Sequence, residues 1–283
     1  MIPTLGDFLR LIERIAPMRL AEPWDNPGLQ IGDPEQKIEK VFSSLDPTLN
    51  ALMAASEANA QVLFTHHPLI FKSISHLETN AYPGHVLAQA VRRNISVVTA
   101  HTNLDIAKGG INDILADLLG LENVEILHPH DKEDGVGLGR VGDLPETTNL
   151  FSLAMDVKKM LGADHIRLVG EKETPVQRVA VVGGSGGSLT SSAARSGADV
   201  FITGDVGHHA ALEAESLGIA LLDGGHFHTE KTAFNIFCEN LKFFFRKEGW
   251  EVGVETDGSQ ADPIWMTSGL FKSTCPANHK RVV

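Results

Sequence analysis

Residues 61–68 have the sequence QVLFTHHP, a short apolar run that ends in two histidines and a proline. Three other stretches follow the same plan, each an apolar run that leads into histidine and carboxylate: 96–105 (SVVTAHTNLD), 200–209 (VFITGDVGHH) and 219–230 (IALLDGGHFHTE). We interpret the runs as parallel strands, because ligands gather outside the carboxyl ends of such strands. The sequence therefore predicts one shared site with nitrogen and oxygen ligands and no sulfur, which suits zinc, iron or manganese.

The segments around these runs alternate between strand and helix patterns. The expected strands are 41–45, 62–65, 96–100, 178–182, 200–203 and 219–222. The expected helices are 5–15, 47–59, 85–93, 111–119, 191–196, 208–217 and 230–245. Such alternation indicates βαβ units and a parallel sheet. We therefore predict an α/β fold with two similar βαβ-containing lobes, mostly parallel sheets and the metal site between the lobes. Duplication would explain the two similar halves, and coincidence is the alternative.

The boundary between the lobes is expected within residues 127–144. Residues 128–137 (HPHDKEDGVG) are polar and glycine-rich and show no periodicity. We expect a first α/β lobe at 1–127 and a second at 128–255, which would end in a strand at 251–255. Residues 256–283 show no periodicity and are expected to form a C-terminal extension.

The composition narrows the class of protein. The 283 residues carry a net charge of −12, and 42% are hydrophobic and 21% charged, as in ordinary globular proteins. An acidic balance argues against nucleic acid as a partner. Two cysteines exclude a disulfide framework and fit a reducing compartment. With no signal peptide expected and no apolar run near the ~20 residues of a membrane span, we expect a cytoplasmic protein with no membrane partner.

Adjacent histidines at 66 and 67 can act in two ways. On a regular strand, His66 and His67 would face opposite sides, but Pro68 should end the strand. Both imidazoles could then turn to one site, or each could bind a different ion. The alternative is one histidine in the core and one exposed to solvent.

Two further pairs of candidate ligands follow later strands. His101 and Asp105 come after the strand at 96–100, where Asp105 could bridge two cations or serve as a helix N-cap. His226 and Glu230 are four residues apart, which puts both side chains on one face of a helix. The alternative for Glu230 is an acid that complements the helix dipole.

Two other motifs each allow more than one role. His208 and His209 could support a ligand or contact a substrate, and we do not predict either as a direct metal ligand. Residues 183–188 (GGSGGS) follow a strand and lack the Lys-Ser/Thr of a P-loop. Their amides could cradle an anion at a helix N-terminus. We favour a tight strand-to-helix turn.

Six motifs together resemble the family of NGG-interacting-factor-like dinuclear metal centre proteins, whose members are often named GTP cyclohydrolase I type 2. These motifs are 24–29 (WDNPGL), 65–71 (THHPLIF), 100–105 (AHTNLD), 182–188 (VGGSGGS), 203–205 (TGD) and 225–230 (GHFHTE). The resemblance covers nearly the whole chain. It implies two related lobes with two metal ions between them, a hexameric toroid, and metal ligands at His66, His67, Asp105, His226 and Glu230.

This resemblance implies a dinuclear metal-dependent hydrolase, GTP cyclohydrolase-like, that acts on a small nucleotide-like substrate such as GTP. Two divalent ions (zinc, iron or manganese) fit metal-assisted hydrolysis. We assign proton transfer to His101, because imidazole titrates near neutral pH. The alternatives are a non-catalytic metal-handling or metal-insertion protein and a regulatory scaffold. Turnover of metal-loaded protein on nucleotides would separate catalysis from metal handling.

Overall fold

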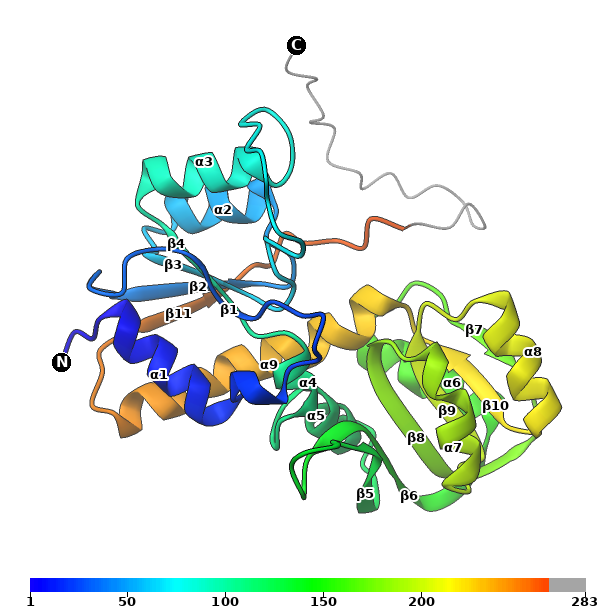
Figure 1. Ribbon diagram of the computed structural model, residues 1–283. Coiled ribbons are helices and arrows are strands. Elements are labelled where there is room, and N and C mark those ends of the chain that lie inside the picture. Colours follow the sequence, from blue (N-terminus) through cyan, green and yellow to red (C-terminus); the bar gives the residue numbers. More distant parts are fainter. Residues whose placement is uncertain (265–283) are drawn as a thin grey trace.

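A computed structural model describes residues 1–264, which form two sheets flanked by helices (Figure 1). The first sheet has the strand order β1-β4-β3-β2-β11. Its strands are β1 (Gly28–Ile31), β2 (Lys40–Ser44), β3 (Val62–Thr65), β4 (Ser96–Thr99) and β11 (Gly253–Thr256). All neighbours pair in parallel except β1, which is antiparallel to β4 at one edge. The carboxyl ends of β2, β3 and β4 therefore meet at one edge of the sheet.

Helices cover both faces of the first sheet. α2 (Leu49–Glu57) and α3 (Gly84–Arg93) lie on one face, and α1 (Leu5–Ile15) and α9 (His226–Lys247) lie on the other (Figure 1). Alternate strand residues divide between these layers: Leu63 packs in the core with α2 and α3, and Phe64 in the core with α1 and α9. Burial on both faces explains why β3 is a continuous apolar run.

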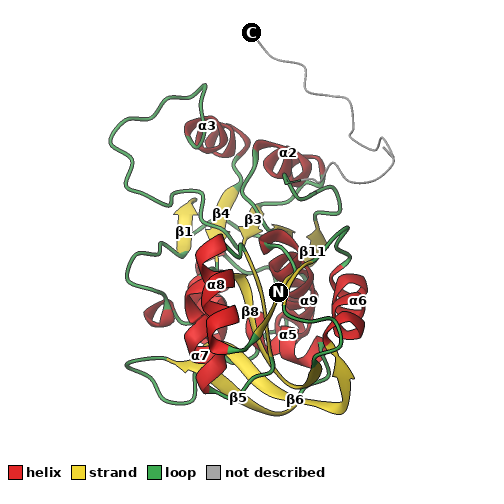
Figure 2. Cartoon of the chain, turned by 90° about the vertical axis from the view of Figure 1, so that its right-hand side faces the viewer, coloured by secondary structure: helices red, strands yellow, loops and turns green. Residues whose placement is uncertain are grey.

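The second sheet has the order β5-β6-β8-β9-β10-β7. Its strands are β5 (Glu122–Pro129), β6 (Gly137–Asn149), β7 (Arg167–Val169), β8 (Pro175–Ser185), β9 (Val200–Gly204) and β10 (Ala220–Asp223). β8, β9 and β10 are parallel, whereas β5, β6 and β7 pair antiparallel with their neighbours. The remaining α-helices are α4 (Thr102–Ile106), α5 (Ile111–Leu118), α6 (Leu150–Leu161), α7 (Thr190–Arg195) and α8 (His208–Leu217). Figure 2 shows α7 and α8 side by side in front of this sheet.

The predicted α/β class, with two sheets that contain parallel strands, is confirmed. Parallel pairs make up most of the first sheet and the β8-β9-β10 part of the second. Of residues 128–137, predicted to be aperiodic, residues 130–136 form the loop between β5 and β6. The two strands themselves, which pair antiparallel within the expected boundary region 127–144, were not predicted. Glycines in β6 make this pairing possible: a β-carbon on Gly137 would lie 2.3 Å from the carbonyl oxygen of His128. β6 therefore has glycines at positions where most strands show alternating apolar residues, and this hid the strand in the sequence. Helix α6 and strand β7 were also not predicted.

The last described strand joins the first sheet. We had expected a strand at 251–255 within the second lobe, but β11 pairs in parallel with β2. Helix α9 is the cause, since it begins beside the second sheet and ends beneath the first (Figure 1). The two sheets therefore do not correspond to the predicted lobes 1–127 and 128–255, because β11 belongs to the first sheet. The division of the chain into these lobes stays a prediction. Residues 265–283 of the expected extension lie outside the described part of the chain.

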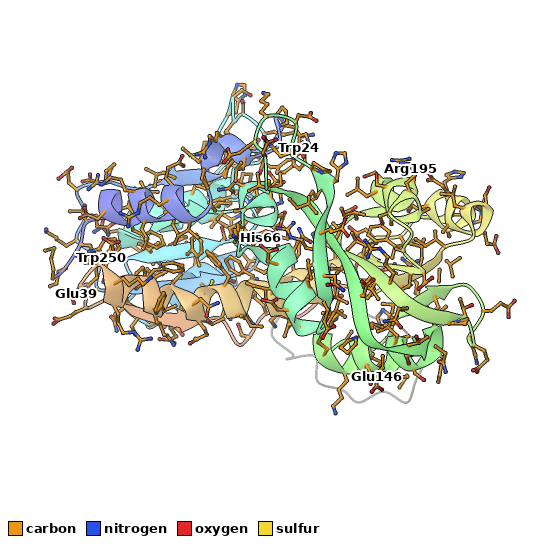
Figure 3. The ribbon with its side chains drawn as sticks, turned by 90° about the horizontal axis from the view of Figure 1, so that it is seen from below. Trp24, Glu39, His66, Glu146, Arg195 and Trp250 are labelled. Carbon is orange, nitrogen blue, oxygen red and sulfur yellow. The ribbon has the colours of Figure 1, made fainter. Side chains whose placement is uncertain are left out.

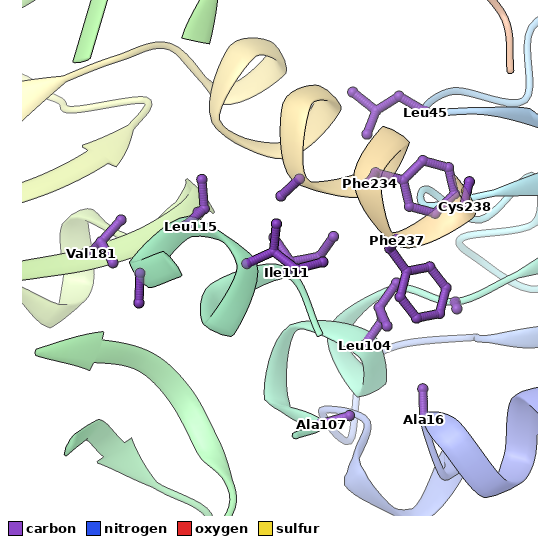
Figure 4. Close-up of a cluster of buried hydrophobic side chains, with 14 of the residues drawn as sticks. Ala16, Leu45, Leu104, Ala107, Ile111, Leu115, Val181, Phe234, Phe237 and Cys238 are labelled. Atoms are coloured by element: carbon purple, nitrogen blue, oxygen red, sulfur yellow. The ribbon is translucent and has the colours of Figure 1, made fainter. Parts of the chain in front are cut away.

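One apolar core extends across both sheets. Ile111 and Leu115 of α5 are buried in the same cluster as Val181 of β8 and as Phe234 and Phe237 of α9 (Figure 4). Residues of α1 and β3 belong to this cluster too. The two sheets are therefore joined by packed side chains. Among the described residues, no helix is both long and apolar enough to cross a membrane.

Candidate metal centre

The candidate ligands lie where three elements meet between the sheets. β3 leads into His66 and His67, and the parallel neighbour β4 leads into His101 and α4, which carries Asp105. α9 begins at His226, so His226 and Glu230 lie one turn apart at its start. Figure 3 shows His66 near the middle of the molecule.

Glu230 is at the centre of this cluster. Its Oε2 lies 3.0 Å from Nε2 of His67 and 3.0 Å from Nε2 of His226. Its Oε1 lies 3.7 Å from Nε2 of His66, and that nitrogen is 3.5 Å from Oδ1 of Asp105. The structure thus brings all five ligands implied by the family resemblance together.

Two buried polar atoms in the cluster, Nε2 of His66 and Oδ1 of Asp105, have no hydrogen-bond partner. Oε2 of Glu230 faces only the Nε2 atoms of His67 and His226, which donate to it only when those rings are protonated. An unsatisfied buried group costs about 1–3 kcal/mol, and more when it is charged. Bound cations would supply partners for these atoms, whose nitrogen and oxygen chemistry suits zinc, iron or manganese. Two groups of three side chains could each hold an ion: His66, His67 and His101, and His67, His226 and Glu230.

Each histidine is oriented by a partner on its other ring nitrogen. Nδ1 of His66 donates to the carbonyl oxygen of Ala100 at 2.8 Å. Nδ1 donates to a carboxylate in the other three, at 2.7–2.8 Å: His67 to Asp46, His226 to Asp205, and His101 to Asp25. These bonds leave Nε2 as the free nitrogen of every ring, which is the arrangement that metal-binding histidines usually show.

Two histidines hold protons tightly in the absence of a cation. Burial lowers the pKa of His67, but hydrogen bonds to Asp46 and Glu230 outweigh burial and raise that pKa to about 10. Burial also opposes the charge on His226, yet Glu230 and Asp205 raise its pKa to about 9. Protonated imidazoles thus balance the carboxylates, a role that a divalent ion could take over.

The pKa values of the buried residues in the cluster are shifted by burial and by the neighbouring charges. Burial lowers the pKa of the His66 imidazole. Burial and the neighbouring Glu230 raise the pKa of Asp105 well above its usual value. Although burial opposes its charge, Glu230 has a pKa well below the usual range, because His66 and the other imidazoles stabilise its anion. Glu230 is thus the permanent anion of the site.

A pocket of about 580 Å³ opens onto this cluster. Trp24, Phe71 and His101 line it from the side of the first sheet, and Val182 and Ser185 line it from the second. Its volume is within the range of small-molecule sites. The cluster of candidate ligands is therefore accessible to a small-molecule ligand.

Sequence comparison decides the family. The family model Duf34/NIF3 (NGG1p interacting factor 3) matches residues 3–263. This chain belongs to the Duf34/NIF3 family. Its relatives include a "GTP cyclohydrolase 1 type 2 homolog" from Clostridium perfringens, 35% identical over 238 residues that cover 84% of this chain and 91% of the relative. A Streptomyces coelicolor protein of the same name is 33% identical over 267 residues, covering 93% of this chain and 94% of the relative.

Solved structures of Duf34/NIF3 relatives share the fold. A Staphylococcus aureus hypothetical protein has a TM-score of 0.88 at 30% identity and covers 94% of this chain and 100% of its own. A Bacillus cereus protein related to NIF3 has a TM-score of 0.87 at 26% identity, covering 94% and 99%. Reduced HcgD from Methanocaldococcus jannaschii has a TM-score of 0.75 at 31% identity, covering 90% and 98%.

Three carboxylates that orient histidines in this Duf34/NIF3 chain were not predicted as site residues. Asp46 follows β2 just as His66 follows β3, and that parallel placement was an available signal. Asp205 follows β9 inside one of the four marked stretches, and its φ of 55° is unusual for a residue other than glycine. Asp25 lies in the WDNPGL motif, which indicated only a turn.

The glycine-rich segment 183–188 makes room for Glu230. Gly184 has a φ of +68°, and a β-carbon there would lie 2.0 Å from Oε1 of Glu230. The Gly184 amide donates to Oγ1 of Thr229, and the Gly183 amide donates to Oδ1 of Asn112. The end of β8 thus packs tightly against the start of α9, and the chain then turns at 186–189 into α7, as the favoured prediction of a tight strand-to-helix turn expects.

Other histidines lie apart from the cluster. His208 and His209 begin α8, and both are exposed to solvent. Their rings contact each other, with centroids 5.8 Å apart, and neither lines the pocket. His228 has its Nε2 3.6 Å from Asp262. None of the three reaches the candidate ligands.

Proposed function

We propose that this Duf34/NIF3 chain binds two divalent metal ions and hydrolyses a small nucleotide-like substrate. The observation that carries the proposal is the set of buried atoms without partners around Glu230. The proposed ligands are His66, His67, Asp105, His226 and Glu230. The two oxygens of Glu230 face different imidazoles, so this carboxylate would be available as a ligand beside all three of His66, His67 and His226. The names of the relatives support a nucleotide substrate.

A bound divalent ion supplies Lewis acidity and lowers the pKa of water, which suits hydrolysis. The protein's own side chains then orient the ligands, and the pocket admits the substrate. We assign proton transfer to His101, whose Nδ1 is held 2.8 Å from Asp25. Asp25 also accepts hydrogen bonds from the amide and hydroxyl of Thr102, so it is fixed in place. His101 therefore presents Nε2 toward the pocket that it lines.

His101 has a second candidate role, because it could hold an ion together with His66 and His67. His101→Ala separates the two roles. Loss of turnover with both ions retained supports proton transfer, whereas loss of one ion makes His101 a ligand. Full turnover with both ions bound would contradict both roles.

The test of the proposed function is metal content followed by turnover. Protein purified without chelator or affinity tag should contain about two ions per chain by elemental analysis, and Glu230→Ala should contain fewer. Glu239→Ala is the matched control, since Glu239 lies on the same helix with a side chain 54% exposed. Metal-loaded protein should then hydrolyse GTP or a related nucleotide. Little metal in the wild type after reloading would overturn the proposal.

Two further expectations stay predictions. The family resemblance implies a hexamer, which light scattering of the purified protein would test. The low cysteine count favours the cytoplasm, which fractionation of cells would test.

A further inference from the structure

Two large aromatic side chains are exposed at the mouth of the pocket. Trp24 is 57% exposed and Phe71 is 47% exposed, and their ring centroids are 5.7 Å apart. Both line the same pocket as His67 and Glu230. Core packing does not account for aromatic surface left in contact with solvent, and paired exposed aromatics beside a polar site indicate a binding surface.

Side-chain amides hold the two aromatic residues in place. Nδ2 of Asn26 donates to the carbonyl oxygen of Ile70 at 2.6 Å. Gln30 bridges the same two segments: its Nε2 donates to the carbonyl of Asn26 at 2.7 Å, and its Oε1 accepts from the amide of Ile70 at 2.9 Å. Gln30 is only 9% exposed. The segments that carry Trp24 and Phe71 are thus tied together, so a ligand meets a wall that is already formed.

The wall is continuous with the candidate metal centre. The ring centroid of His101 lies 6.0 Å from that of Trp24 and 6.4 Å from that of Phe71. The residue after Trp24 is Asp25, which accepts the hydrogen bond from His101. One loop therefore positions both the aromatic surface and the histidine assigned to proton transfer. In Figure 3, Trp24 lies toward the outside of the molecule relative to His66.

We propose that Trp24 and Phe71 form an aromatic wall that binds a planar heteroaromatic ring of the substrate by stacking. Stacking on aromatic side chains accepts every nucleobase, because every base presents a π-face. The ring would lie on the wall while the bond to be cut points toward Glu230. This inference rests on the proposed function for its substrate. It adds which residues select a substrate with a heteroaromatic ring over a sugar that lacks one.

The experiment measures nucleoside binding by calorimetry, with guanosine, adenosine and uridine as probes and ribose as the control that lacks a nucleobase. Full-length protein is used both metal-loaded and metal-free, since the wall is formed by protein atoms alone. Nucleosides should bind and ribose should not. Trp24→Ala and Phe71→Ala should each weaken guanosine binding about 5- to 150-fold, and Trp24→Phe should retain most of the affinity.

Phe243→Ala is the matched control. Phe243 is 50% exposed and lies 17 residues after His226 on α9, about 25 Å along the helix. This variant should bind guanosine like the wild type. Circular dichroism and metal content should be unchanged in every variant, because Trp24 and Phe71 are exposed at the surface and neither is among the proposed metal ligands.

Three results would overturn the aromatic wall: no nucleoside binds the wild type, Trp24→Ala binds guanosine as well as the wild type, or Trp24→Ala changes only the oligomeric mass. The last result would make the wall an interface between copies of the chain. Failure of the proposed function looks different. Metal or turnover would then be absent while Trp24→Ala still weakens nucleoside binding.

Discussion

Gly184 and Glu230 are in such close contact that any side chain at position 184 would collide with the carboxylate. A β-carbon there would lie 2.0 Å from Oε1 of Glu230. Gly197 has a similar backbone, with a φ of +76° against +68° at Gly184, but no heavy atom lies within 4 Å of its virtual β-carbon. Gly197 is therefore a control that separates the effect of backbone strain from the effect of contact with the candidate metal centre.

Gly184→Ala should reduce both stability and metal content. Alanine in the left-handed region costs about 1–2 kcal/mol at either glycine, and only at position 184 does it also displace Glu230. We expect Gly184→Ala to lose more unfolding free energy than Gly197→Ala and to bind less metal. Denaturant unfolding and elemental analysis measure the two effects. Equal behaviour of the two variants would show that Glu230 can move aside at little cost.

Asp46→Ala should weaken metal binding although Asp46 contacts no ion in the proposed site. It removes the carboxylate that orients His67 through Nδ1 at 2.7 Å. Loss of such a partner usually costs about 10- to 100-fold in affinity or activity. A competition titration with a chelating dye measures the change. Asp131→Ala, at an exposed position between β5 and β6, should bind metal normally, and an equal loss there would refute the explanation.

Asp25→Ala should reduce turnover more than it reduces metal content. Asp25 holds the ring of His101 and the hydroxyl of Thr102, and it makes no contact with Glu230. Without it, His101 can rotate away from the pocket. We expect about a 10- to 100-fold fall in kcat with both ions retained, checked by turnover and metal analysis on the same preparation. Loss of an ion instead would identify His101 as a ligand.

Metal uptake should strengthen as the pH rises from about 6 to about 8. The pKa of His67 is about 10 and that of His226 about 9 in the metal-free protein, so both rings are protonated over this range. An ion reaches Nε2 only when a proton leaves, and each displaced proton makes the apparent affinity about tenfold higher per pH unit. We expect a slope between one and two, measured by calorimetry in buffers of different ionisation enthalpy. A pH-independent affinity would contradict these ligands.

Unfolding should occur in one transition despite the two sheets. Leu115 of α5 and Phe234 of α9 are buried in a core that both sheets share. Phe234→Ala should cost about 3–5 kcal/mol and Leu115→Ala about 2–5 kcal/mol. Both should lower the midpoint of the same calorimetric transition. Two transitions, of which each variant moves only one, would show that the lobes unfold independently.

The parts of the fold that were predictable are those with strong local signals. β3 and β4 are buried on both faces, so their apolar runs were visible, and the four-residue spacing of His226 and Glu230 indicated a helix face. β6 was missed because its glycines serve backbone approach. The sheet to which β11 belongs depends on the path of α9, which no local pattern encodes. Asp46 was missed because an acid after a strand is common, and only the fold places it beside His67.

The candidate centre joins two distant parts of the chain. Nε2 of His67 and Nε2 of His226 lie 3.3 Å apart, although 159 residues separate them in sequence. A chain emerging from the ribosome exposes its paired histidines long before residue 230 has been made, and β11, which completes the first sheet, emerges later still. During synthesis these early histidines have no carboxylate partner on α9. An ion held by His67 together with His226 or Glu230 could therefore bind only after the start of α9 has been made and has packed beside β3.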